Sequence, residues 1–306
     1  MKLSKAHKAI FALIVANIIW GAASPIFKWS LQGTPLFTLA FLRFLIPLIL
    51  IFIFTKKKDL AIKEKDFMKI FMLSFLGLSI NIAFSFIGLT QTASINAPII
   101  GSSGPIFIVL GSLLFLNEHP KKKVILGNMI GFLGILLILL QPLIQHTPNM
   151  AILGNFFLII ATLGTVGNTI ISRKVLQEYK PITITFWAFL IATITFLPPF
   201  AQEVLTKGFL PHANMHAFVG IIFGAFLSSW VGYYLFFYSL KYLMASEIGV
   251  FQYIDPVVTI VIAMPLLHEV PNATFLFGSF LIFFGIYVAE GRIHYHPLHK
   301  FFSKKS

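Results

Sequence analysis

One carboxylate, Asp255, lies near the middle of an apolar run, residues 245–267, that is long enough to cross a bilayer. An ionised Asp at the centre of a membrane helix costs about 2.5–3.5 kcal/mol on insertion scales, and ionisable groups in such places are functional by default. Gln252 shares the helical face of Asp255. We interpret Asp255 as a cavity-facing group that binds a proton or a cation. The alternative is a structural Asp that is protonated, or paired with Arg43 or Lys28.

The stretch NIIWGAASPIFK, residues 17–28, places polar and helix-breaking residues inside another apolar run. On a helix, Asn17, Trp20, Pro25 and Lys28 fall on one stripe, which can face protein or a water-filled cavity instead of lipid. Asn17 and Trp20 are therefore candidate substrate contacts. Lys28 lies near the end of its run, where it either snorkels to the interface or attracts an anionic substrate group.

Other apolar runs carry polar or aromatic stripes of the same kind. Small polar stripes serve helix packing at least as often as substrate binding. The aromatic stretch SSWVGYYLFFYSLKY, residues 228–242, suits an apolar, aromatic or cationic solute, or else a lipid-facing surface near the interface. The candidate substrate-binding residues are Asn17, Trp20, Lys28, Asn81, Ser85, Asn96, Ser103, Trp230, Tyr234, Gln252 and Asp255.

The composition requires lipid as the solvent for most of the chain. Of the 306 residues, 58% are hydrophobic and 11% are charged, and the mean hydropathy is +0.89. A soluble domain is about a quarter charged. We predict an all-α integral membrane protein with ten transmembrane helices, which lie at 9–29, 36–55, 68–89, 94–116, 124–141, 151–172, 182–200, 215–238, 245–267 and 273–290.

The distribution of Lys and Arg predicts the orientation of these spans. With the N-terminus inside, twenty Lys and Arg fall in cytoplasmic connections, whereas only Lys28 and Lys207 fall outside. The positive-inside rule then puts both termini in the cytoplasm, and we expect a bacterial cytoplasmic membrane. The net charge of +13 is thus explained by topology and contact with anionic lipid headgroups, without a nucleic-acid partner.

Residues 104–135 and 255–286 repeat each other without a gap at an offset of 151. Pro105 matches Pro256, Glu118 matches Glu269 and Pro120 matches Pro271. Two apolar helices would seldom share these residues in register by chance. We give them structural roles, since Pro suits the first turn of a helix and a nearby carboxylate can accept from its free N–H groups.

An odd number of spans in each half reverses the orientation of the second half. We therefore predict two five-helix repeats, residues 1–142 and 143–306, in one membrane domain and related by an axis in the membrane plane. Inverted repeats are an architecture of secondary transporters, whose substrate site lies between the halves near the bilayer midplane.

The spacing N-x-x-W-G-x-x-x-P-x-x-K, the stretch FTLAFLRFLIPLILI with Arg43, and the twin P…E-x-P…G…G stretches resemble the EamA-type carriers of the drug/metabolite transporter superfamily. The resemblance covers nearly the whole chain. It implies a ten-span carrier that moves amino acids, related metabolites, sugars or drugs through a central cavity. It also implies an architectural role for Arg43. Two features depart from the family pattern: the sixth span lacks a counterpart of Trp20, and Asp255 replaces an apolar or small residue.

The chain has no Cys, phosphate-binding loop or metal-ligand pattern, so we predict no cofactor, no metal and no enzymatic activity. We expect an exporter of amino acids or related amphiphilic solutes that works by alternating access, with possible proton coupling through Asp255. Export of hydrophobic cations or drugs is the alternative within transport. A membrane enzyme or lipid-handling protein is the alternative from another class. The oligomeric state, the coupling ion and the direction of transport are not determined by the sequence.

Overall fold

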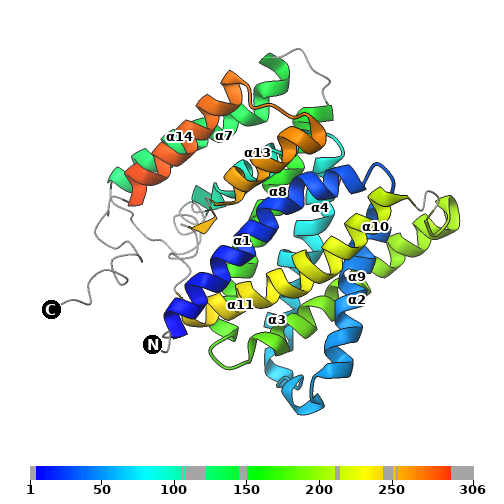
Figure 1. Ribbon diagram of the computed structural model, residues 1–306. Helices are drawn as coiled ribbons and strands as arrows, with labels where there is room; N and C mark the ends of the chain where they lie inside the picture. Colours follow the sequence, from blue (N-terminus) through cyan, green and yellow to red (C-terminus); the bar gives the residue numbers. More distant parts are fainter. Residues whose placement is uncertain are drawn as a thin grey trace.

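The computed structural model describes residues 5–104, 106–107, 122–144, 150–210, 214–243, 251–252 and 254–290. All regular structure in these residues is helical, with no strand (Figure 1). Three of the residues that the repeat suggested as structural, Pro105, Glu118 and Pro120, lie outside this part of the chain.

The helices follow the predicted spans closely. The first half contains α1 (Lys5–Ser30), α2 (Leu36–Phe54), α3 (Phe67–Ser74), α4 (Asn81–Leu89), α5 (Asn96–Gly101) and α7 (Lys122–Ile144). The second half contains α8 (Met150–Val175), α9 (Pro181–Lys207), α10 (Met215–Ile222), α11 (Gly232–Tyr242), α13 (Ile254–Leu267) and α14 (Ala273–Glu290). Short 3-10 helices, η1 (Lys57–Asp59) and η2 (Glu64–Asp66), lie between α2 and α3.

Seven helical stretches in the described residues are long and apolar enough to cross a membrane: His7–Ser30, Leu36–Phe54, Glu64–Leu89, Ile125–Leu143, Met150–Val175, Pro181–Lys207 and Met215–Tyr242. Ile254–Leu267 and Ala273–Gly285 are shorter apolar helices. The predicted spans 94–116 and 245–267 fall partly outside the described residues. The fold is therefore that of a multi-pass helical membrane protein.

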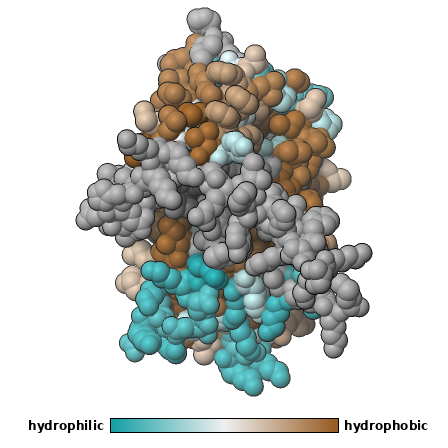
Figure 2. Space-filling view, turned by 90° about the vertical axis from the view of Figure 1, so that its left-hand side faces the viewer, coloured by the Kyte–Doolittle hydropathy of each residue, from teal (hydrophilic) through white to brown (hydrophobic). Residues whose placement is uncertain are grey.

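The surface agrees with a bilayer environment. Large apolar side chains such as Phe54, Leu205 and Val261 are 66–87% exposed, which is costly in water and normal against lipid. Figure 2 shows hydrophobic residues over the upper part of one face and hydrophilic residues gathered at its lower end.

The helices pack in a regular pattern. The pairs α2 with α9 and α7 with α14 lie at opposite edges of the molecule, with α1, α4, α8, α11 and α13 between them (Figure 1). Within this middle group, α1 packs on α11 and α13, and α8 packs on α4 and α5.

Glycines allow close approach of α7 and α14. A Cβ on Gly134 would lie 2.5 Å from the carbonyl oxygen of Gly278, and a Cβ on Gly285 would lie 2.5 Å from that of Gly127. These four glycines belong to the repeated stretches. Small residues at such positions let two backbones meet, which drives helix association in lipid.

Two of the long helical stretches contain π-helical segments. One, η3 (Phe75–Ile80), joins α3 to α4, and the other, η4 (Phe223–Val231), joins α10 to α11. A π-helical turn bonds residue i to i+5, so it adds a residue to the turn and rotates the side chains that follow; such segments are frequent at functional sites.

Two ion pairs join the loop after α2 to the loop after α8. Lys63 Nζ lies 2.9 Å from Glu178 Oε2, and Lys180 Nζ lies 2.7 Å from Asp59 Oδ1. The hydrogen bond from Lys180 lowers the pKa of Asp59, and the hydrogen bond from Lys63 lowers the pKa of Glu178. Both carboxylates are therefore charged and paired at neutral pH.

Candidate functional site

A cavity of about 190 Å³ lies among the central helices. Residues of α1, α2, α4, α5, α8, α11, η3 and η4 line it, together with Gln252 and Asp255 at the start of α13. Five of the candidate residues are in its wall: Trp20, Asn81, Ser85, Gln252 and Asp255. The structure thus brings together residues from both halves of the chain that lie up to 235 positions apart.

Asp255 reaches this cavity because α1 and α13 approach closely. A Cβ on Gly21 would lie 2.8 Å from the backbone oxygen of Asp255, and Thr259 Oγ1 donates to Gly21 O at 2.6 Å. Asp255 is in the first turn of α13, where the helix dipole favours a negative charge. Its Oδ1 is buried and has no hydrogen-bond partner. A buried carboxylate oxygen without a partner is costly, and a ligand would satisfy it.

Arg43 also lines the cavity, although its side chain is only 2% exposed. Its Nε donates to Ser229 Oγ at 3.1 Å and its Nη2 donates to Ser228 Oγ at 3.0 Å. The guanidinium carbon lies 4.5 Å from the ring centre of Phe27, which contributes a cation–π interaction. The remaining nitrogen, Nη1, is buried and has no hydrogen-bond partner. Two nitrogens of Arg43 therefore bond to serine hydroxyls and orient the side chain, while the third nitrogen, Nη1, can donate to a ligand.

The π-helical segment η4 holds both Arg43 and Trp20. Besides the two serine hydroxyls, the backbone oxygen of Ser228 accepts a hydrogen bond from Trp20 Nε1 at 3.1 Å. The Trp20 ring packs on Tyr233 and Phe236, with ring centres 5.2 and 5.0 Å away. The irregular turn explains why Tyr233, and not the predicted Tyr234, lines the cavity.

Amides from α4 and α8 form the opposite wall. Asn81 Nδ2 donates to Thr165 Oγ1 at 2.8 Å and to Ala161 O at 2.9 Å. Asn168 Nδ2 donates to Leu73 O at 2.7 Å. These bonds fix the amide groups, so this wall presents oriented dipoles and no net charge.

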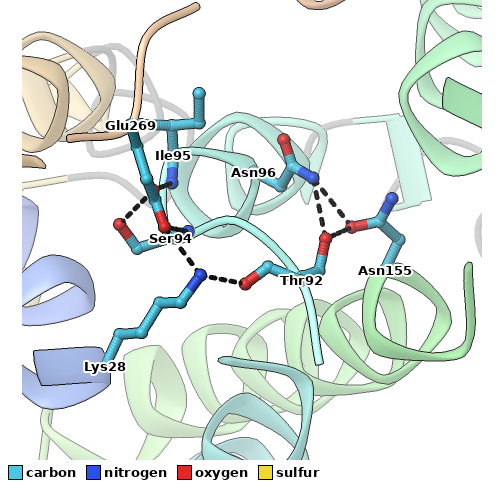
Figure 3. A network of polar contacts seen from close by, with 7 residues as sticks. All are labelled: Lys28, Thr92, Ser94, Ile95, Asn96, Asn155 and Glu269. Atoms are coloured by element: carbon cyan, nitrogen blue, oxygen red, sulfur yellow. Dashed lines mark hydrogen bonds and ion pairs between the residues drawn. The ribbon is translucent and has the colours of Figure 1, made fainter. Parts of the chain in front are cut away.

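A separate polar network surrounds Glu269 (Figure 3), and none of its residues lines the cavity. Lys28 Nζ, at the end of α1, donates to Glu269 Oε1 and to Thr92 O, both at 2.6 Å. The carboxylate of Glu269 also accepts from Ser94 N at 3.0 Å, Ser94 Oγ at 2.7 Å and Ile95 N at 3.2 Å. Glu269 thus ties the ends of α1 and α13 to the segment before α5.

This arrangement differs from the expectation that Glu269 serves the helix that follows it. The N–H of Phe275, in the first turn of α14, is satisfied by Asn272 Oδ1 at 2.8 Å instead. His268, with φ of 55°, adopts the left-handed conformation between α13 and Glu269. Lys28 pairs with Glu269 and not with Asp255.

The other candidate residues lie away from the central cavity. Asn96 belongs to a buried cluster in which Asn155 Oδ1 accepts from Asn96 Nδ2 at 2.9 Å and from Thr92 Oγ1 at 2.7 Å (Figure 3). Asn17 donates to Leu13 O of its own helix, and Ser103 Oγ donates to Ile100 O. Trp230 and Tyr234 line a second hollow near the end of α2.

Sequence reasoning missed Arg43 as a cavity residue and missed Ser228 and Ser229, which hold it. Spacing alone gave no signal for Arg43, since one polar residue in an apolar helix has no stripe to show which way it faces. The pair of serines opening SSWVGYY was a signal, but only contacts across helices reveal their partner. In the described part of the chain, no three His, Asp or Glu side chains gather to hold a metal ion.

A helical membrane bundle around a small cavity with aromatic and polar walls is an arrangement that a multi-pass transporter of small molecules can use. The profile of the EamA-like transporter family matches residues 7–140 and again residues 152–290. The chain belongs to the EamA-like transporter family, and this membership points to transport instead of catalysis.

Relatives agree with this assignment, and a solved structure shares the fold. The chain is 26% identical over 295 residues to an uncharacterized transporter of Archaeoglobus fulgidus, a match that covers 95% of this chain and 99% of the relative. A second transporter of that organism is 29% identical over 92% of this chain and 98% of its own. The uncharacterized transporter YdfC of Bacillus subtilis is 26% identical over 88% and 86%. One crystal structure has the same fold, with a TM-score of 0.65, 16% identity and coverage of 92% and 96%.

Proposed function

We infer that this protein is a secondary carrier that exports amino acids or related amphiphilic metabolites by alternating access. The observation that carries this proposal is the pair of unpartnered groups in one cavity, Nη1 of Arg43 and Oδ1 of Asp255. A carboxylate on the solute would accept from Arg43, and an ammonium on the same solute would donate to Asp255. An amino acid carries both groups, so it neutralises both sites at once.

The size of the cavity favours a small solute. Pockets for drug-sized ligands occupy about 300–1,000 Å³, whereas this cavity is about 190 Å³. Its aromatic wall, formed by Trp20, Phe27, Phe86, Tyr233 and Phe236, suits the apolar part of an amphiphilic solute.

Two inverted five-helix halves, residues 1–142 and 143–306, would place this cavity at their interface. The packing supports such halves. If each helix is replaced by its counterpart in the other half, the contact of α1 with α13 becomes the contact of α8 with α5, and the contact of α1 with α11 becomes the contact of α8 with α4. The same replacement relates η3 to η4. It leaves two contacts unchanged, that of α2 with α9 and that of α7 with α14. The two matches of the family profile divide the chain near the same boundary.

Alternating access requires that one mouth of the cavity closes while the other opens. The Lys28–Glu269 network supports a closed mouth, since it lies next to the cavity residues Leu89 and Ala97 and ties three chain segments. By the positive-inside rule this end faces outwards, and both termini face the cytoplasm. A carrier in this state would accept its solute from inside.

Proton coupling would use the same carboxylate. Asp255 can hold either a proton or the ammonium of the solute, so the two compete, and this competition is the basis of exchange. The Asp255→Asn variant should then transport with a pH dependence unlike that of the wild type. An unchanged rate and an unchanged pH profile in liposomes would rule out coupling through Asp255.

Export of hydrophobic cations is the second candidate, favoured by Asp255 together with the aromatic wall. Arg43 argues against it, because its buried positive charge would repel such a solute. A membrane enzyme or lipid-handling protein would need a cluster of reactive side chains at a membrane face. Among the described residues, no group of three His, Asp or Glu side chains could hold a metal ion for such chemistry.

The test is a thermal-stability screen of metabolites on purified protein, followed by counterflow in proteoliposomes. A ligand at 100 times its dissociation constant stabilises the state it binds by about 2.7 kcal/mol. We expect amino acids to raise the Tm and to support counterflow. Stabilisation by lipophilic cations without any effect of amino acids would select the second candidate. Because the chain has no native Cys, single cysteines at Lys57 and Lys207 can test that these positions label from opposite sides.

A further inference from the structure

A second hollow lies at the basic end of the bundle, between the end of α2, the start of α9 and the span that contains η4 and α11. Its volume is about 650 Å³, and it shares no lining residue with the central cavity. Its walls are Phe54, Thr55, Lys56, Lys58, Asp59, Lys180, Ile182, Trp230 and Tyr234. The transport cavity leaves these residues without a role.

One rim of the hollow is positively charged. Asp59, the one carboxylate among its lining residues, is paired with Lys180 at 2.7 Å. Lys56 and Lys58 are exposed, and the described residues place no carboxylate within ion-pair distance of either ammonium group. The rim therefore offers the exposed ammonium groups of Lys56 and Lys58, neither of which has an ion-pair partner in the described part of the chain.

The other wall is apolar and reaches into the membrane-spanning part of the molecule. Phe54 is 76% exposed and Tyr234 is 37% exposed. Trp230 lies twelve residues before the last residue of α11, Tyr242, which is about 18 Å along a helix. The wall thus extends from the headgroup level to a depth that acyl chains occupy.

We propose that this hollow is a binding site for one anionic phospholipid. The phosphate group lies between Lys56 and Lys58, and an acyl chain packs along Phe54, Ile182, Trp230 and Tyr234. Charge complementarity favours a lipid with net negative charge, since basic pockets beside membrane helices attract such headgroups. The deep aromatic wall favours a lipid over a soluble phosphate, which would leave that wall empty.

The experiment uses the full chain, delipidated in a neutral detergent, and brominated-chain phospholipids that quench tryptophan fluorescence. Phosphatidylglycerol and phosphatidylcholine with identical chains are titrated separately. We expect phosphatidylglycerol to quench at about tenfold lower mole fraction. The Trp230→Phe variant keeps an aromatic wall and should lose most of this quenching, because the other three tryptophans lie outside the hollow.

The double variant Lys56→Gln/Lys58→Gln should bind phosphatidylglycerol as weakly as phosphatidylcholine. Its matched control is Lys57→Gln, which removes an exposed Lys of the same loop that does not line the hollow. Equal quenching by the two lipids, or an equal effect of the control, would overturn the proposal. Glycerol phosphate should not displace the lipid, and full displacement would show a site for soluble phosphates instead. Amino-acid binding in the central cavity is unaffected in either case.

Discussion

At the residue scale, the proposed function depends on two ionisable side chains that the protein leaves incompletely satisfied. Arg43 is oriented by Ser228 and Ser229 and retains a free Nη1, while Asp255 retains a free Oδ1. Burying such groups without partners is unfavourable. Serine partners hold the guanidinium without neutralising its charge, which preserves its attraction for a solute carboxylate.

Three ligands separate the roles of these side chains: an amino acid, the amine without its carboxylate, and the acid without its amine. Asp255→Asn should weaken binding of the amino acid at least tenfold and leave the acid unaffected. Arg43→Gln should weaken binding of the amino acid by about 30- to 5,000-fold, because losing one partner of a buried charge pair costs about 2–5 kcal/mol. It should not weaken binding of the amine, which Arg43 repels. Isothermal titration measures both. Equal losses for all three ligands in both variants would show that the residues only support the fold.

At the scale of elements, irregular and close-packed helices set the geometry of the site. The π-helical segment η4 supplies the carbonyl that holds Trp20 and the hydroxyls that hold Arg43. The pair α7 and α14 has little to do with the cavity, since none of its residues line it. Its glycines let the two helices pack closely at one edge of the molecule.

The variant Gly285→Ala tests this close packing. Its new methyl group would lie 2.5 Å from Gly127 O and close to the backbone nitrogen of Gly131, so the helices must separate. Overpacking of this kind costs about 1–3 kcal/mol, and we expect a lower Tm in detergent with unchanged ligand selectivity. The control is Gly101→Ala, where a Cβ meets nothing within 4 Å. Equal Tm values for the two variants would contradict the packing argument.

At the scale of the whole molecule, the Lys28–Glu269 network joins segments from both proposed halves. The ion pair is only partly accessible, with side chains 26% and 11% exposed, and three further donors surround the carboxylate. A connection of this density can hold one mouth of the cavity closed, yet each bond is polar and can be exchanged for water when the segments part.

Glu269→Gln should weaken this closure, since a neutral amide cannot balance Lys28. With Ser85→Cys in the cavity as the single thiol, we expect a membrane-impermeant maleimide to label the variant several-fold faster from the side of Lys28. The background without Glu269→Gln sets the reference rate, and Glu178→Gln, which breaks an exposed ion pair at the opposite end, is the control. A labelling rate that Glu269→Gln leaves unchanged would refute a closing role.

Much of the fold could be predicted because lipid imposes it locally. Each membrane span must satisfy its backbone within one helix. The length of the apolar runs and the residues that end them therefore predicted α1, α2 and α8 to within a few residues, whereas α9 continues to Lys207, beyond the predicted end at residue 200. The repeat and the resemblance were visible in the sequence itself, because residues such as Pro256 and Glu269 recur at a fixed offset.

The tertiary structure decided which polar groups meet. Asn17 and Trp20 share a stripe in the sequence, but only Trp20 reaches the cavity. Glu269 caps a segment 174 residues away, and Arg43 finds its partners across another helix. The physical reason is that helical periodicity sets the face of a residue relative to its own axis, whereas its neighbours depend on how that axis is placed and on π-helical turns that rotate it.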